Sequence, residues 1–123
     1  MHKLYNISVR WVSTTVTLEV IERMDKFVQN CGDFIRWDGG TWLLWSGLNI
    51  ETINAQVRVP LRTEDSLLIC VLDTRESFTG WAAPWIWDWL NAKRAEALRQ
   101  SAPLSNLYGS NALMGGLKPP KLP

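Results

Sequence analysis

The sequence predicts an α+β fold in which one four-stranded antiparallel sheet is covered by two helices. Four short β-prone segments lie within the first 72 residues, and two segments with helical spacing of apolar residues separate them. The resulting order is strand, helix, strand, strand, helix, strand. This is the split βαβ, or ferredoxin-like, arrangement, and an extra C-terminal helix and an extended tail follow it.

The first 45 residues supply four of these elements. A strand is expected over residues 4–11, where Tyr5, Ile7 and Val9 alternate with polar residues. Hydroxyl residues, early acidic residues and helically spaced apolar residues predict a helix over residues 17–31. Residues 34–37 and 41–45 are β-prone and flank a turn sequence, DGG, which predicts a hairpin.

The residues that follow complete the pattern. Asn49 can cap a short helix over residues 50–58, which Pro60 ends. The unbroken apolar run at residues 67–72 predicts a strand that lies at the centre of the sheet beside the first strand. Pro84 opens a last helix that runs to about Gln100.

These elements predict two parts. Residues 1–102 form a ferredoxin-like domain that includes the C-terminal helix, and residues 103–123 form a docking tail. The tail holds too many apolar residues for a solvated segment and too much Gly and Pro for a core of its own. We therefore expect it to dock on the domain or on a second copy.

Composition bounds the function classes. The chain has 123 residues, 46% hydrophobic and 20% charged, which is enough for one core without disulfides or a structural metal. Its net charge of +1 excludes a wholly basic nucleic-acid coat. Residues 1–92 hold eight Lys or Arg against eleven Asp or Glu, and residues 93–123 hold five against one. The basic end can contact the acidic body, a second copy or phosphates, or form a solvated helix face.

Neither the cysteines nor the hydropathy pattern suggests a secreted or membrane protein. Cys31 and Cys70 lie among apolar neighbours without metal-ligand spacing, so both are expected to be reduced core residues. The N-terminus lacks an apolar signal region, and no run reaches the roughly 18 apolar residues of a transmembrane helix. A cytoplasmic protein without a membrane partner is expected.

Eight tryptophans exceed what a core of this size easily covers. The excess suits a dimer or protein-partner interface, an oversized core or a base-stacking platform. Trp42 and Trp45 are three apart on a strand, so they should lie on opposite faces. Trp45, Trp81 and Trp87 are the expected interface residues.

Arginines are the candidate phosphate-binding groups. The arginines that could contact phosphates are Arg10, Arg36, Arg58, Arg62 and Arg75. Of these, Arg10, Arg36 and Arg75 are the expected nucleic-acid-binding residues, with tryptophans stacking on bases. The spacing of Arg10 and Arg36 suggests neighbouring strands. The alternative is that these arginines lie separately on solvated surface.

Catalytic groups are few. His2 is the only histidine, which leaves no Ser/His or Cys/His pair, and no glycine-rich phosphate loop opens a helix. Asp38 and Asp73 remain as carboxylates, but each lies beside a turn where hydrogen bonding to the backbone is the simpler role. No cofactor is expected.

Short segments resemble a known family. Residues 4–9 (LYNISV), 37–44 (WDGGTWLL), 63–69 (TEDSLLI) and 80–81 (GW) are similar to SinR-like ferredoxin-like proteins, relatives of the CRISPR-associated adaptation subunit and of VapD-type endoribonucleases. The resemblance covers residues 4–90. It implies a symmetric dimer that exchanges a C-terminal strand. In catalytic members it implies a divalent ion held by an Asp near the end of the first strand.

Arg10 stands at that Asp position. A guanidinium repels a divalent ion and offers only donors. The expected function is therefore a non-catalytic homodimeric binding or scaffolding protein of a nucleic-acid-linked system, such as phage defence or a toxin–antitoxin pair. The alternative is an endoribonuclease that uses Asp38 or Asp73 with Mg²⁺ or Mn²⁺.

Overall fold

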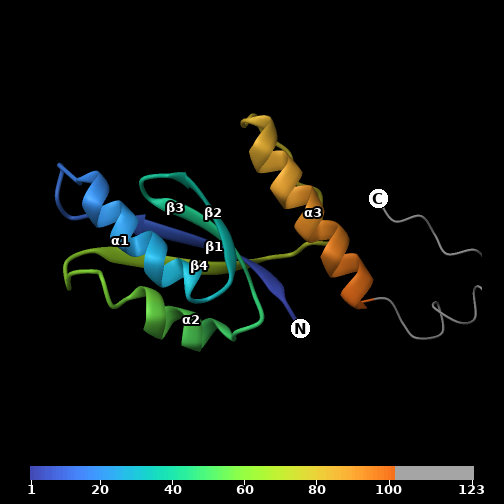
Figure 1. Ribbon diagram of the computed structural model, residues 1–123, viewed down its shortest axis with the longest axis horizontal. Helices are drawn as coiled ribbons and strands as arrows, with labels where there is room; N and C mark the ends of the chain where they lie inside the picture. Colours follow the sequence, from blue (N-terminus) through green and yellow to red (C-terminus); the bar gives the residue numbers. More distant parts are fainter. Residues whose placement is uncertain (102–123) are drawn as a thin grey trace, which may run out of the picture. The chain divides into compact units, whose positions relative to one another are not determined.

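The structure is a computed structural model that describes residues 1–101 (Figure 1). It divides into two compact units, residues 1–73 and a second unit that begins at Thr74. The first unit contains β1 (Lys3–Arg10), α1 (Leu18–Gln29), β2 (Asp33–Asp38), β3 (Thr41–Ser46), α2 (Ile50–Val57) and β4 (Ser66–Leu72), and the second contains α3 (Pro84–Ser101). The predicted ferredoxin-like α+β fold with an extra helix is confirmed. The predicted docking tail, residues 103–123, lies outside the described residues.

The sheet has the order β2-β3-β1-β4, and all its pairs are antiparallel. β1 is central, as predicted, but the prediction that β4 is central is wrong because β4 forms an edge. Its apolar run suggested two buried faces. Leu67 and Ile69 do pack against the core, whereas Leu68 and Val71 are 64% and 48% exposed. An unbroken apolar run therefore marks an edge strand here.

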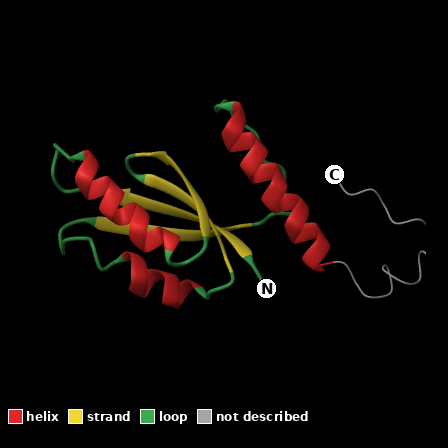
Figure 2. Ribbon diagram, in the orientation of Figure 1, coloured by secondary structure: helices red, strands yellow, loops and turns green. Residues whose placement is uncertain are grey.

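Both α1 and α2 cover the same face of the sheet (Figure 2). The alternating side chains of β1 place Tyr5, Ile7 and Val9 in the core beneath these helices. In the β1–β3 register, Tyr5 lies opposite Leu44 and Ile7 lies opposite Trp42, all of them buried. Each such side chain contributes about 1.5–3 kcal/mol when fully buried.

The helix starts follow the capping signals. The Thr17 hydroxyl accepts a hydrogen bond from the Val20 amide at 3.3 Å, and the Asn49 side chain accepts one from the Thr52 amide at 2.8 Å. These bonds satisfy amides that the first turn of a helix leaves unpaired. α1 ends at Gln29, earlier than the spacing predicted.

In the second unit, Arg94 ties the segment after β4 to α3. Its guanidinium donates to the carbonyl oxygens of Thr74 at 3.3 Å and Glu76 at 2.7 Å, and lies 4.7 Å from the Phe78 ring centroid. Ile86 is among the buried residues of this helix. Within residues 1–101, no helix is long and apolar enough to cross a bilayer.

Gly32 permits a close backbone approach that yields the first prediction. A Cβ atom at this position would overlap the backbone carbonyl oxygen of Trp45, which belongs to β3 and cannot turn aside. Replacing Gly32 by Ala should lower the free energy of unfolding by about 1–3 kcal/mol, the usual cost of overpacking. Urea denaturation monitored by tryptophan fluorescence measures the change.

Gly47 is the matched control for this substitution. The nearest atoms to a Cβ there belong to the side-chain ring of His2, at 3.2 Å, and a side chain can shift where a backbone carbonyl cannot. Gly47→Ala should therefore leave the unfolding midpoint nearly unchanged. Equal losses in the two variants would contradict the packing explanation.

Candidate functional site

A groove lies at the end of the sheet where β1 finishes, the β2–β3 turn closes and β4 begins. It encloses about 890 Å³. We call it the Arg10 groove, and its lining residues are Ser8, Val9, Arg10, Asp38, Gly39, Gly40, Thr41, Ser66, Leu67 and Leu68.

Strand register gathers the polar groups of the Arg10 groove. Arg10 lies opposite Ser66 on β4, and Ser8 lies opposite Thr41 on β3. Because Val9 points into the core, the side chains of Ser8 and Arg10 project from the face opposite the helices. One exposed guanidinium beside three hydroxyl groups forms a set of donors suited to phosphate oxygens.

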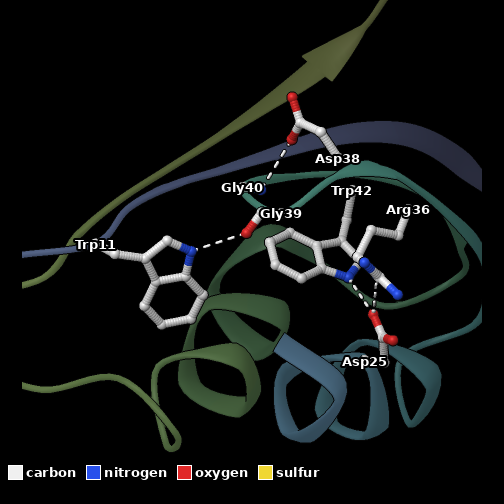
Figure 3. Close-up of polar contacts among 7 residues, drawn as sticks. All are labelled: Trp11, Asp25, Arg36, Asp38, Gly39, Gly40 and Trp42. Carbon is white, nitrogen blue, oxygen red and sulfur yellow. Dashed lines mark hydrogen bonds and ion pairs between the residues drawn. The ribbon is translucent and has the colours of Figure 1, made fainter. Parts of the chain in front are cut away.

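Asp38 shapes the turn that borders the groove. Its Oδ1 atom accepts a hydrogen bond from the Gly40 amide at 2.8 Å (Figure 3). The simpler role predicted for Asp38, hydrogen bonding to the loop backbone, is confirmed. The Gly40 carbonyl accepts from the Val9 amide at 2.8 Å, and a Cβ on Gly40 would lie 2.8 Å from the Val9 carbonyl oxygen. The backbone of the turn is therefore in direct contact with the backbone of β1.

Trp11 secures the same turn from the other side. Its indole Nε1 donates to the Gly39 carbonyl at 2.8 Å (Figure 3), and its ring packs against the core. This positioning role of Trp11 is not among the sequence predictions. The available signal was an aromatic residue with a donor group immediately after β1.

Asp65 fixes the chain that leaves β1 to the loop that enters β4. Its two carboxylate oxygens accept hydrogen bonds from the Val12 amide at 2.8 Å and the Arg62 amide at 2.9 Å. The side chain is only 2% exposed, and the Arg62 Nε atom lies 3.9 Å away. Burial alone would raise the pKa of Asp65, but the two amides and the Arg62 charge outweigh it and hold that pKa below its ordinary value.

The structure separates Arg10 from Arg36. β3 lies between β1 and β2, so the prediction that these arginines occupy neighbouring strands is wrong. The hairpin places β3, not β2, beside β1. Arg36 faces the helices, where its Nε donates to Asp25 Oδ1 at 3.1 Å, and the same oxygen accepts from Trp42 Nε1 at 2.7 Å (Figure 3). Arg36 therefore links β2 to α1.

The remaining candidates are dispersed. Asp73 follows β4, whose Leu72 pairs with Leu4, so it lies at the opposite end of the sheet from Asp38. Arg75 belongs to the second unit. Among the 101 described residues, no three His, Cys, Asp or Glu side chains are grouped as a metal ion would require.

The predicted interface tryptophans differ in exposure. Trp81 is 99% exposed, Trp87 is partly buried, and Trp45 is buried with its ring 5.5 Å from that of His2. Trp42 and Trp45 do lie on opposite faces of the sheet, as predicted. The interface role of Trp45, Trp81 and Trp87 stays a prediction, and little of the Trp45 surface is left for a partner.

The two cysteines also differ. Cys31 is buried, its thiol donates to the Phe27 carbonyl at 3.6 Å, and burial raises the pKa of that thiol. The prediction that Cys70 is a core residue is wrong, because Cys70 is exposed on the edge strand β4.

Asp65 provides the second prediction. At pH 7, Asp65→Asn should lower the free energy of unfolding by about 1–3 kcal/mol, because a charged acceptor of two backbone amides is lost. The folded-state pKa is lowered, so the ionised carboxylate stabilises the fold above its unfolded pKa of about 3.9. This stabilisation disappears as the pH falls through the folded-state pKa. Urea denaturation between pH 7 and pH 2.5 should show the difference from wild type shrinking below about pH 4.

Glu64→Gln is the control for this pH dependence, since Glu64 is the exposed neighbouring carboxylate. It should leave stability nearly unchanged at both ends of the range. A difference between Asp65→Asn and wild type that is the same at pH 7 and pH 2.5 would contradict the role assigned to the ionised carboxylate.

Comparisons with known proteins do not place the chain in a family. No family model, curated protein or solved structure matches the chain. The resemblance to SinR-like proteins therefore stays a prediction, and the Arg10 groove and the edges of the sheet are the features on which a function can be proposed.

Proposed function

We propose that this chain is a non-catalytic homodimer that binds nucleic acid or scaffolds a nucleic-acid-linked system, of the phage-defence or toxin–antitoxin kind. The observation that carries the proposal is the Arg10 guanidinium at the end of β1, exposed in a groove with three hydroxyl groups. The kind of system comes from the SinR-like resemblance.

The charge at Arg10 favours binding over metal-dependent cleavage. The resemblance places a metal-binding Asp at this position, and Arg10 supplies a permanent cation with donors only. Such a group attracts phosphate oxygens and repels a divalent ion. Asp38 borders the same groove, but one of its oxygens already accepts the Gly40 amide of the turn. Phosphate contact is therefore the chemistry that these side chains support best.

The two edges of the sheet support self-association through β4. The β2 edge carries Asp33, Arg36 and Asp38, and its register shifts between the last two, features that discourage pairing with another strand. β4 has the sequence SLLICVL, with neither a charged residue nor a proline, and β1 is its only neighbour in the described sheet. A two-fold axis beside β4 would pair it antiparallel with the β4 of a second copy.

Lysines on the β4 edge provide the third prediction. The double substitution Leu68→Lys, Val71→Lys places charge on two exposed side chains, one on each face of the edge. Light scattering should give about twice 14.1 kDa for the wild type and 14.1 kDa for the variant. Charges on an exposed edge oppose strand pairing and leave the core intact.

The control places the same charges on α1. Leu18 and Val20 are also exposed, so Leu18→Lys, Val20→Lys should remain dimeric. A monomeric wild type would refute the homodimer. A dimer that survives the β4 substitutions would refute the β4 edge as its interface.

Arg10 provides the fourth prediction. Arg10→Gln should weaken binding of a fluorescent single-stranded RNA and lower the slope of log affinity against log salt by about 1, as expected for the loss of one phosphate contact. Fluorescence anisotropy titrations at salt concentrations from about 50 to 300 mM measure both quantities, because counterion release makes the affinity fall as the salt concentration rises. Arg23→Gln removes the same charge from the exposed surface of α1 and should change neither.

The endoribonuclease alternative is tested with the same RNA. Incubation with Mg²⁺ or Mn²⁺ should leave the RNA intact. Cleavage that Asp38→Asn or Asp73→Asn abolishes would replace the binding function by the alternative. Absence of RNA and DNA binding together with a stable dimer would leave a scaffold and refute the nucleic-acid contact at Arg10.

A further inference from the structure

A second concavity lies where α2 ends and β4 begins. It encloses about 370 Å³, within the size range of small-ligand sites. Leu61 and Leu67 contribute the apolar part of its lining, and the polar part comes from Asn54, Arg58, Arg62, Thr63 and Asp65. We call it the Arg58/Arg62 hollow.

The hollow has an excess of positive charge. Within residues 1–101, no carboxylate forms an ion pair with the Arg58 guanidinium. The Arg62 side chain is 60% exposed, and only its Nε atom approaches a carboxylate, that of Asp65 at 3.9 Å. Asp65 also lines the hollow, but its side chain is only 2% exposed and both its oxygens accept hydrogen bonds from backbone amides, which partly offset its charge. The lining thus holds two guanidinium groups and one carboxylate, whose negative charge is partly offset by two backbone amides.

The end of α2 does not oppose an anion as strongly as a bare helix C-terminus would. Unpaired carbonyl groups give such an end a partial negative charge. Here the Asn54 carbonyl accepts from the Arg58 amide at 3.1 Å, and the Gln56 carbonyl accepts from the Val59 amide at 3.3 Å. The Arg58 carbonyl in turn accepts from the Leu61 amide at 3.0 Å. Arg58 itself adds a cation at this position.

We propose that the Arg58/Arg62 hollow binds a phosphoryl group, that of a small phosphomonoester or of a phosphorylated nucleic-acid end. Two guanidinium groups match the double charge and the several acceptor oxygens of a phosphoryl group better than the single charge of a carboxylate. The Asn54 amide and the Thr63 hydroxyl supply further donors. The site depends neither on the dimer nor on the Arg10 groove.

The test titrates the ¹⁵N-labelled full chain with inorganic phosphate, with a 5′-phosphorylated dinucleotide and with the same dinucleotide bearing a 5′-hydroxyl. Saturable shifts should appear at the backbone amides of residues 58–65 other than Pro60, both with phosphate and with the phosphorylated dinucleotide. Arg58→Gln and Arg62→Gln should each weaken binding about tenfold, the effect of losing one charge-assisted hydrogen bond. Arg58→Lys should retain part of the affinity because it keeps the charge.

Two comparisons decide the result. Tighter binding of the phosphorylated dinucleotide than of inorganic phosphate identifies a nucleic-acid end as the ligand, and equal binding identifies a free phosphoryl group. Arg23→Gln, on α1, should bind like the wild type. The proposal is overturned by absence of saturable shifts, by an equal loss in Arg23→Gln, or by acetate binding as tightly as phosphate. Unchanged circular dichroism confirms that each variant is folded.

Discussion

The indole of Trp42 is the point on which the first unit depends. It is wholly buried near the middle of the sheet, and its N–H would be costly to leave unpaired. Asp25 of α1 accepts that hydrogen bond, and the same oxygen binds Arg36 of β2. One carboxylate thereby fixes a helix to two adjacent strands. Because the ring must be covered and its N–H satisfied together, α1 has one register over β3.

This arrangement leaves the polar groups of β1 on the opposite face. Val9 must enter the core, so Arg10 and Ser8 project away from the helices. Asp38 and Trp11 both bind the backbone of the β2–β3 turn, which holds one wall of the Arg10 groove in place. The groove is therefore made by rigid elements and backbone hydrogen bonds, which is a suitable basis for binding because little conformational entropy is left to lose.

The beginning of β4 is where the proposed interactions meet. Leu67 lines both the Arg10 groove and the Arg58/Arg62 hollow, so the two concavities border the same strand. Asp65, just before this strand, anchors the loop to the chain after β1 and thereby fixes both sites. Under the two proposals, phosphate groups are bound at this end of the sheet, and the β4 edge pairs with a second copy.

The sequence by itself determined the elements and their caps, because periodicity and capping are local. The alternation of β1, the hydroxyl of Thr17 and the side chain of Asn49 each act within a few residues, and the structure agrees with them. Only the tertiary structure decided which strand lies at an edge and which side chains meet, because an apolar run reads the same at the centre and at an edge. Asp65 and its partner Val12 are 53 residues apart, and the hairpin separates Arg10 from Arg36 by inserting β3. Such partners are brought together by strand order, which no local pattern encodes.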